Sequence, residues 1–138
     1  MLILRRLFIW LLETSMETLL LAVILVSLSG NGKHAYIRDV AVSSVWIGAM
    51  FFSTGYLFTT GIARTIWQPR RVWLYPMLAT LLFLIHFEIL NYTAGGIFDP
   101  AKRAVIRIAG GCIVLVCTFA GSMALQKRPA GQSRRQGI

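Results

Sequence analysis

Four long apolar runs constrain this chain more than any other feature of its sequence. They cover residues 8–28, 41–63, 73–92 and 104–125, and each is close to the length of about 20 residues that a helix needs to cross a bilayer core. The composition agrees, since 57% of the residues are hydrophobic and 14% are charged, which is too apolar for an ordinary soluble domain. The sequence therefore predicts an integral membrane protein with four spans.

The segments between these runs are short, so consecutive helices must pack beside one another. Runs such as "LLLAVILV" are apolar at every position, whereas the strands of a membrane barrel alternate in polarity. The predicted fold is all-α, a polytopic four-helix transmembrane bundle over residues 1–126 followed by a basic tail over residues 127–138.

The first thirty residues also share features with a secretory signal, namely Arg5 and Arg6 before an apolar stretch that ends in "SLSG". The polar segment "ETSMET" inside that stretch is unusual for such a signal. A retained transmembrane helix is the preferred interpretation.

The distribution of basic residues predicts the orientation of the chain. The side that carries both termini receives nine of the fourteen lysines and arginines, and the other side receives five. Because basic residues concentrate on the cytoplasmic side, we expect both termini in the cytoplasm and the protein in a prokaryotic plasma (inner) membrane.

The net charge of +9 is dispersed over the ends of the spans, which does not suit a nucleic-acid partner. Basic residues at span ends favour anionic lipid headgroups, and the bilayer is the first expected partner. Docking of the basic tail on an acidic protein is the alternative.

Glu13 and Glu17 lie within the first span and share one face of it, because residues four apart in a helix are neighbours. A charge at this depth costs about 2.5 to 3.5 kcal/mol on insertion scales, so both side chains should point into the bundle. Two close carboxylates also repel, which favours one of them holding a proton.

Comparison of depths predicts two structural ion pairs, Glu88 with Arg107 and Glu13 with Arg64. These pairings leave Glu17 without a basic partner, close only to the hydroxyls of nearby serines and threonines. Glu17, with Glu13, is therefore the candidate proton or substrate site. His86 is a secondary candidate. It lies about 200° from Glu88 around the helix, so the two cannot face one site on a regular helix.

The sequence gives little support for a catalytic site or for a bound cofactor. Cys112 and Cys117 are five residues apart and form neither a redox pair nor a metal site. His34 and His86 differ in depth, which disfavours haem ligation. We expect no catalytic residues, no cofactor and no metal, and an enzyme is not favoured.

Small residues in the second and fourth spans predict close helix packing, for example the stripe formed by Gly110, Cys117 and Gly121. This packing could occur within the chain, in a homo-oligomer or in a larger membrane complex.

Two functions follow from these patterns. The preferred hypothesis is a non-catalytic subunit or scaffold of a membrane complex, whose buried charges specify helix packing. The alternative is a small oligomeric transporter or carrier, proton-coupled or acting on a lipid-linked substrate, that uses its intramembrane carboxylates. Small multidrug transporters are an analogy in size and topology only.

Overall fold

A computed structural model describes residues 2–29, 36–67, 69–93 and 99–127. These ranges contain five helices and no strand: α1 (Leu2–Ser29), α2 (Tyr36–Ser53), α3 (Tyr56–Ile66), α4 (Leu74–Thr93) and α5 (Pro100–Gln126). The all-α fold is confirmed. His34 and all of the predicted tail beyond Lys127 lie outside the described residues.

Three helices, α1, α4 and α5, are each long and apolar enough to cross a membrane. The helices α2 and α3 supply a fourth span only if the two are counted together. The length and composition of these helices support an integral membrane protein.

The second predicted span, residues 41–63, is not one straight helix. The chain bends by 72° between α2 and α3. Gly55 makes the turn with a φ of 81°, in the left-handed region that side chains with a Cβ avoid. Hydropathy alone cannot detect this break, because the residues around it are as apolar as a continuous span requires.

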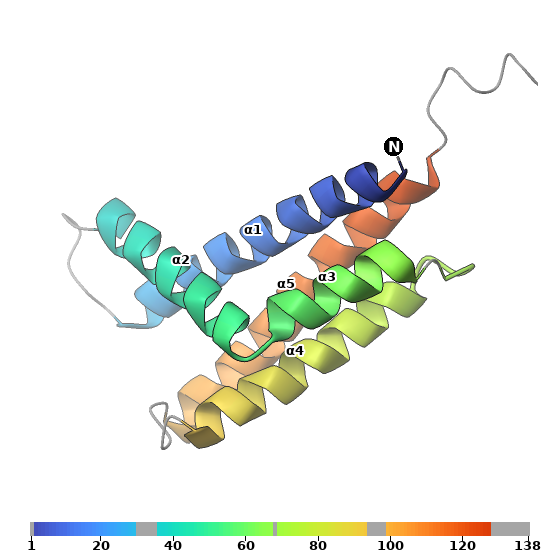
Figure 1. Cartoon of the computed structure of the whole chain (residues 1–138). Helices are drawn as coiled ribbons and strands as arrows, with labels where there is room; N and C mark the ends of the chain where they lie inside the picture. Colours follow the sequence, from blue (N-terminus) through green and yellow to red (C-terminus); the bar gives the residue numbers. More distant parts are fainter. Residues whose placement is uncertain (1, 30–35, 68, 94–98, 128–138) are drawn as a thin grey trace, which may run out of the picture.

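The helices pack as a bundle from which α2 diverges (Figure 1). The helices α4 and α5 lie side by side, α1 packs on α5, and α3 lies between α1 and α4. In contrast, α2 crosses α1 and packs mainly on α1 and α3. One end of the bundle therefore gathers the start of α1, the end of α3, the start of α4 and the end of α5, and we call it the basic end after its arginines.

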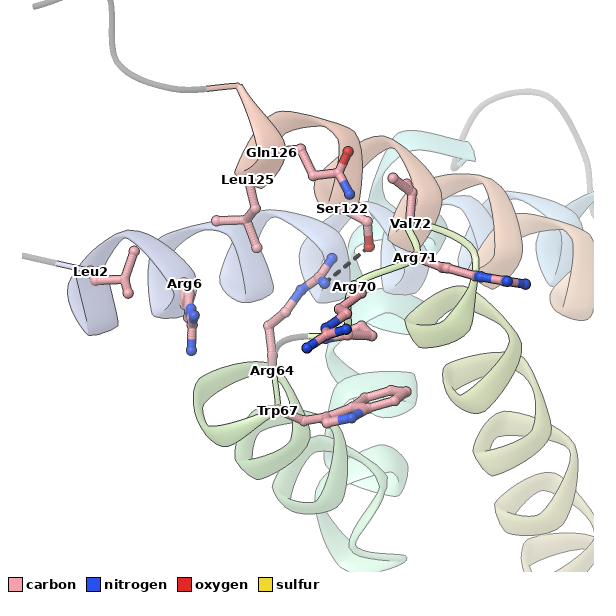
Figure 2. A pocket seen from close by; sticks show the side chains of 11 residues that line it. Leu2, Arg6, Arg64, Trp67, Arg70, Arg71, Val72, Ser122, Leu125 and Gln126 are labelled. Atoms are coloured by element: carbon pink, nitrogen blue, oxygen red, sulfur yellow. Dashed lines mark hydrogen bonds between the residues drawn. The ribbon is translucent and has the colours of Figure 1, made fainter. Parts of the chain in front are cut away.

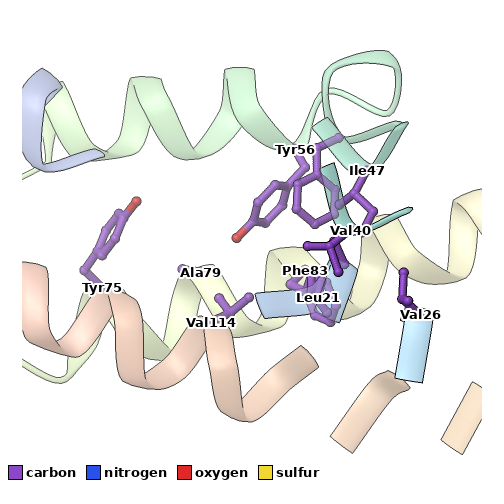
Figure 3. Close-up of a cluster of buried hydrophobic side chains, with 11 residues drawn as sticks. Leu21, Val26, Val40, Ile47, Tyr56, Tyr75, Ala79, Phe83 and Val114 are labelled. Carbon is purple, nitrogen blue, oxygen red and sulfur yellow. The ribbon is translucent and has the colours of Figure 1, made fainter. Parts of the chain in front are cut away.

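An aromatic cluster supports the bend from within the core (Figure 3). The ring of Tyr56 lies 4.7 Å from that of Phe51 and 6.2 Å from that of Phe83, measured between centroids. All three side chains are buried, and they come from α3, α2 and α4. Such offset aromatic contacts add to the free energy of simple burial.

Small residues allow two close approaches inside the bundle. Gly110 faces the ring of Phe83, and a Cβ there would come within 2.5 Å of it. Gly121 faces the carboxylate of Glu13 and the side chain of Ile9. These two members of the predicted stripe in α5 thus pack within the chain. Gly48 of α2 differs, because a Cβ at that position would meet nothing within 4 Å.

Substitution of Gly55 tests the origin of the bend. Gly55→Ala should lower the free energy of unfolding by about 1 to 2 kcal/mol, because alanine disfavours the left-handed conformation. Gly48→Ala is the matched control, since the helical backbone there accepts alanine with equal or higher stability. Thermal unfolding in detergent measures both effects. Equal melting temperatures for the two variants would show that Gly55 does not determine the bend.

Candidate functional site

A buried ion pair joins α1 to α3 near the basic end. Arg64 contacts both carboxylate oxygens of Glu13, with Nη2 on Oε1 and with Nε donating to Oε2 at 3.3 Å. Each side chain is only 4% exposed. The structure thus places together the two residues that the depth comparison pairs.

The guanidinium of Arg64 also connects the other two long helices. Its Nη1 donates to Ser122 Oγ at 3.0 Å, and its Nη2 donates to the carbonyl oxygen of Thr118 at 3.2 Å, both in α5. The ring of Tyr75 in α4 lies 3.8 Å from the guanidinium carbon, a cation–π contact. One side chain therefore links α1, α3, α4 and α5, with its charge paired to Glu13 and its remaining donors satisfied by α5.

Glu17 occupies a different environment one helical turn farther along α1. Its side chain is among the most deeply buried of the described residues, and Glu17 is 1% exposed. Its Oε2 accepts a hydrogen bond from the hydroxyl of Tyr56 at 2.9 Å. In the described part of the chain, Glu17 forms no ion pair. This second carboxylate is held by a neutral donor rather than by a cation.

The position of Tyr56 relates Glu17 to the bend. Tyr56 is the first residue of α3 and directly follows Gly55. The side chain that holds Glu17 therefore starts at the break between α2 and α3. Any movement of this break would move the partner of the buried carboxylate.

The four hydroxyls that sequence proximity suggests for Glu17 hydrogen-bond elsewhere. Thr14, Thr18 and Ser53 donate to backbone carbonyls of their own helices, and Thr54, in the turn after α2, donates to the carbonyl oxygen of Met50. This is the usual arrangement for hydroxyls in membrane helices, where it satisfies the donor locally. Among the described residues, Glu17 is therefore held by Tyr56 and not by these hydroxyls.

Polar and aromatic side chains complete the layer around the two carboxylates. Trp10 donates to Thr60 Oγ1 at 3.1 Å, and the hydroxyl of Tyr75 donates to the carbonyl of Thr60 at 3.3 Å. The ring of His86 lies 5.9 Å from that of Tyr56, measured between centroids, and its Nδ1 is 2.7 Å from the carbonyl oxygen of Leu82. His86 is thus a neighbour of Tyr56, and it forms no hydrogen bond or ion pair with either carboxylate among the described residues.

The other predicted pair, Glu88 and Arg107, lies toward the opposite end of the bundle. Arg107 Nε is 2.5 Å from Glu88 Oε1, and the two side chains are 42% and 51% exposed, respectively. This pair joins α4 to α5 but stands apart from the buried layer. It fits a packing role and takes no part in the candidate site.

Sequence reasoning missed Tyr56 and Tyr75, the two tyrosines of the site. A signal for Tyr56 exists, because Tyr56, Thr60 and Arg64 are spaced four residues apart and form the buried face of α3. Tyr75 carries no comparable signal, since its contact with Arg64 depends on how α4 packs. Within the described ranges, no group of three histidine, cysteine, aspartate or glutamate side chains could hold a metal ion.

Removal of Arg64 should destabilise the fold strongly. Arg64→Met leaves Glu13 buried without a counter-charge, which costs about 3 to 5 kcal/mol. Arg107→Met breaks an exposed pair and should cost about 1 kcal/mol or less. Thermal unfolding of both variants in the same detergent gives the comparison. A similar loss for both would mean that the buried pair does not hold the helices together.

The close approach of Gly121 to Glu13 makes a separate prediction. In Gly121→Ala, the added methyl group would overlap the Glu13 carboxylate and displace it from Arg64, so the melting temperature should fall. Gly111→Ala is the control, because its Cβ would meet only an ordinary contact with Thr80 at 3.8 Å. A melting temperature of Gly121→Ala that equals that of Gly111→Ala would contradict the packing described here.

Comparison of the chain with known protein families, with curated proteins and with solved structures gives no significant match. What the site can do has to follow from this chain's own residues, chiefly the Glu13–Arg64 pair and Glu17.

Proposed function

We propose that the protein is a small membrane carrier for an amphiphilic, lipid-like substrate, with Glu17 as the working carboxylate. The observation that carries this proposal is the placement of Glu17, buried to 1% exposure and held by the first residue after a 72° break in a helix pair of membrane-spanning length. Interrupted helices at membrane depth are tolerated where they are buried in protein or line a path, and transporters build their substrate sites from them.

The charge of Glu17 supplies a physical means of control. With a proton, the side chain is neutral and adds no charge to the layer around Tyr56. Without a proton, it places a negative charge at membrane depth, where electrostatic interactions are weakly screened. A change between these states alters the barrier that a charged headgroup meets beside the break.

The surroundings of the break favour a substrate with an apolar part. A pocket of about 50 Å³ lies between α1, α2, α4 and α5 on the side of Glu17 away from the basic end. All of its lining residues are apolar: Leu21, Leu25, Ile47, Met50, Phe51, Phe83, Phe87, Leu90 and Ile106. A fully polar solute finds no polar partner in this pocket, whereas part of an acyl or isoprenoid chain meets a suitable surface.

The Glu13–Arg64 pair has a fixed role in this proposal. Its hydrogen bonds to Ser122 and Thr118 keep the helices of the basic end together while the region around Glu17 changes. Both termini are proposed to face the cytoplasm of a prokaryotic inner membrane, on the basis of the excess of basic residues at that end.

A second candidate is a non-catalytic subunit or scaffold, as a homo-oligomer or within a larger complex. One observation favours it. Gly48 forms a notch on α2 that no described atom fills, and small residues of this kind allow a helix from another chain to approach closely. Under this proposal the buried charges serve only to specify helix packing.

The carrier proposal predicts the behaviour of Glu17→Gln in vesicles. Purified protein is reconstituted into phosphatidylcholine vesicles that contain a trace of fluorescent phosphatidylglycerol, and external dithionite reports lipid that reaches the outer leaflet. Wild-type protein should accelerate this movement. Glu17→Gln should slow it by about tenfold, which corresponds to about 1.4 kcal/mol in the barrier.

Two controls make the outcome specific. Glu17→Gln should melt at the wild-type temperature or above, because a buried titrating group is replaced by a neutral one of equal size. Glu88→Gln, which changes an exposed carboxylate toward the other end, should keep the wild-type rate. Wild-type movement no faster than in protein-free vesicles, or a full rate with Glu17→Gln, would reject the carrier and leave the subunit role.

A further inference from the structure

A cavity of about 280 Å³ opens at the basic end, with Arg64 among its lining residues (Figure 2). Among the described residues, no aspartate or glutamate lines it, and the polar lining consists of four arginines, a serine and a glutamine: Arg6, Arg64, Arg70, Arg71, Ser122 and Gln126. Leu2, Trp67, Pro69, Val72 and Leu125 complete the wall. The volume is several times the roughly 30 Å³ that one water molecule occupies in the liquid, so the cavity can hold a small polar group.

The arginines differ in how far they are already engaged. Arg64 is neutralised by Glu13, and Arg6 donates to the carbonyl oxygen of Thr65 at 2.9 Å near the end of α3. Arg70 is exposed and forms no ion pair or hydrogen bond with the described part of the chain. In Figure 2 the guanidinium of Arg71 points away from the other three. Arg70 is therefore the arginine most available to a ligand.

The cavity has a positive electrostatic potential, because its described lining contains arginines and no acidic side chain. Arg6 and Arg70 add two positive charges to this recess beyond the Glu13–Arg64 pair, and their repulsion is stronger where protein and lipid reduce the screening by water. An anion in the recess removes this repulsion. Guanidinium groups bind phosphate oxygens in a two-pronged geometry, and the neighbouring hydroxyl of Ser122 and amide of Gln126 can donate to a remaining oxygen.

We propose that this cavity is a binding site for a phosphate ester. The apolar part of the wall, with Leu2, Trp67 and Leu125 partly open to the surroundings, also suits the glycerol or chain that such an ester carries. A phospholipid headgroup and a soluble phosphate ester present the same group to the arginines. For the carrier proposal, this site would specify a phosphate-containing headgroup on the substrate. Binding at the site does not require transport and can be measured separately.

The test is equilibrium binding to the full-length protein in an uncharged detergent. The probes are inorganic phosphate, glycerol 3-phosphate and phosphatidylglycerol in mixed micelles, with phosphatidylcholine micelles as the neutral-headgroup reference. Affinity is obtained from the rise in melting temperature with probe concentration at constant ionic strength. Arg70→Glu reverses one charge in the cavity, and Lys102→Glu makes the same change in charge at the opposite end.

At least one of the phosphate probes should bind, and Arg70→Glu should weaken it by about tenfold or more, while Lys102→Glu leaves it unchanged. Binding of glycerol 3-phosphate or phosphate itself would identify a site that reads the phosphate group alone. Binding of phosphatidylglycerol alone would identify a lipid headgroup site. The proposal is overturned if no phosphate probe binds, or if the two variants weaken binding equally.

This outcome is separable from that of the carrier proposal. Binding that depends on Arg70 without lipid movement would retain the site and reject the carrier. Lipid movement that depends on Glu17 without such binding would retain the carrier and reject the site.

Discussion

The buried ion pair between Glu13 and Arg64 is the interaction on which the rest of the structure depends. Neither side chain could remain charged at this depth alone, because the cost of removing a charge from water is large. Arg64 meets that requirement through contacts to α1, α4 and α5 while itself belonging to α3. The pair thereby fixes the relative rotation of the four helices, since any slip would leave two charges without partners.

The same pair separates two regions that could serve a function, the surroundings of Glu17 and the arginine-lined cavity. With Arg64 committed to Glu13, the hydroxyl of Tyr56 is the one side chain in the described part of the chain that hydrogen-bonds to Glu17, and Tyr56 directly follows the bend at Gly55. On the other side of the pair lies the arginine-lined cavity. Arg64 is shared by both regions, so a negative group in the cavity would compete with Glu13 for the same guanidinium. The buried layer and the cavity are thus electrostatically connected through one side chain.

The sequence predicts the parts of this structure that depend on hydropathy and depth. Apolar runs locate α4 to within one residue and α5 to within four, whereas α1 begins six residues before the predicted span. Matching depths place Arg64 beside Glu13 and Arg107 beside Glu88. The bend could not be predicted in this way, because a φ of 81° at Gly55 leaves no trace in hydropathy. The partner of Glu17 was also missed, since nearby hydroxyls bond to their own helices and Tyr56 reaches Glu17 only because the break redirects α3.

If this one chain, alone or with identical copies, holds the complete site, the purified protein should contain no other chain. The most direct measurement is the mass of the intact complex after gentle purification in an uncharged detergent. That mass should be a whole-number multiple of 15.4 kDa, with any excess explained by bound lipid. A stoichiometric foreign chain would contradict it, and the function would then belong to a larger assembly of which this protein is a subunit.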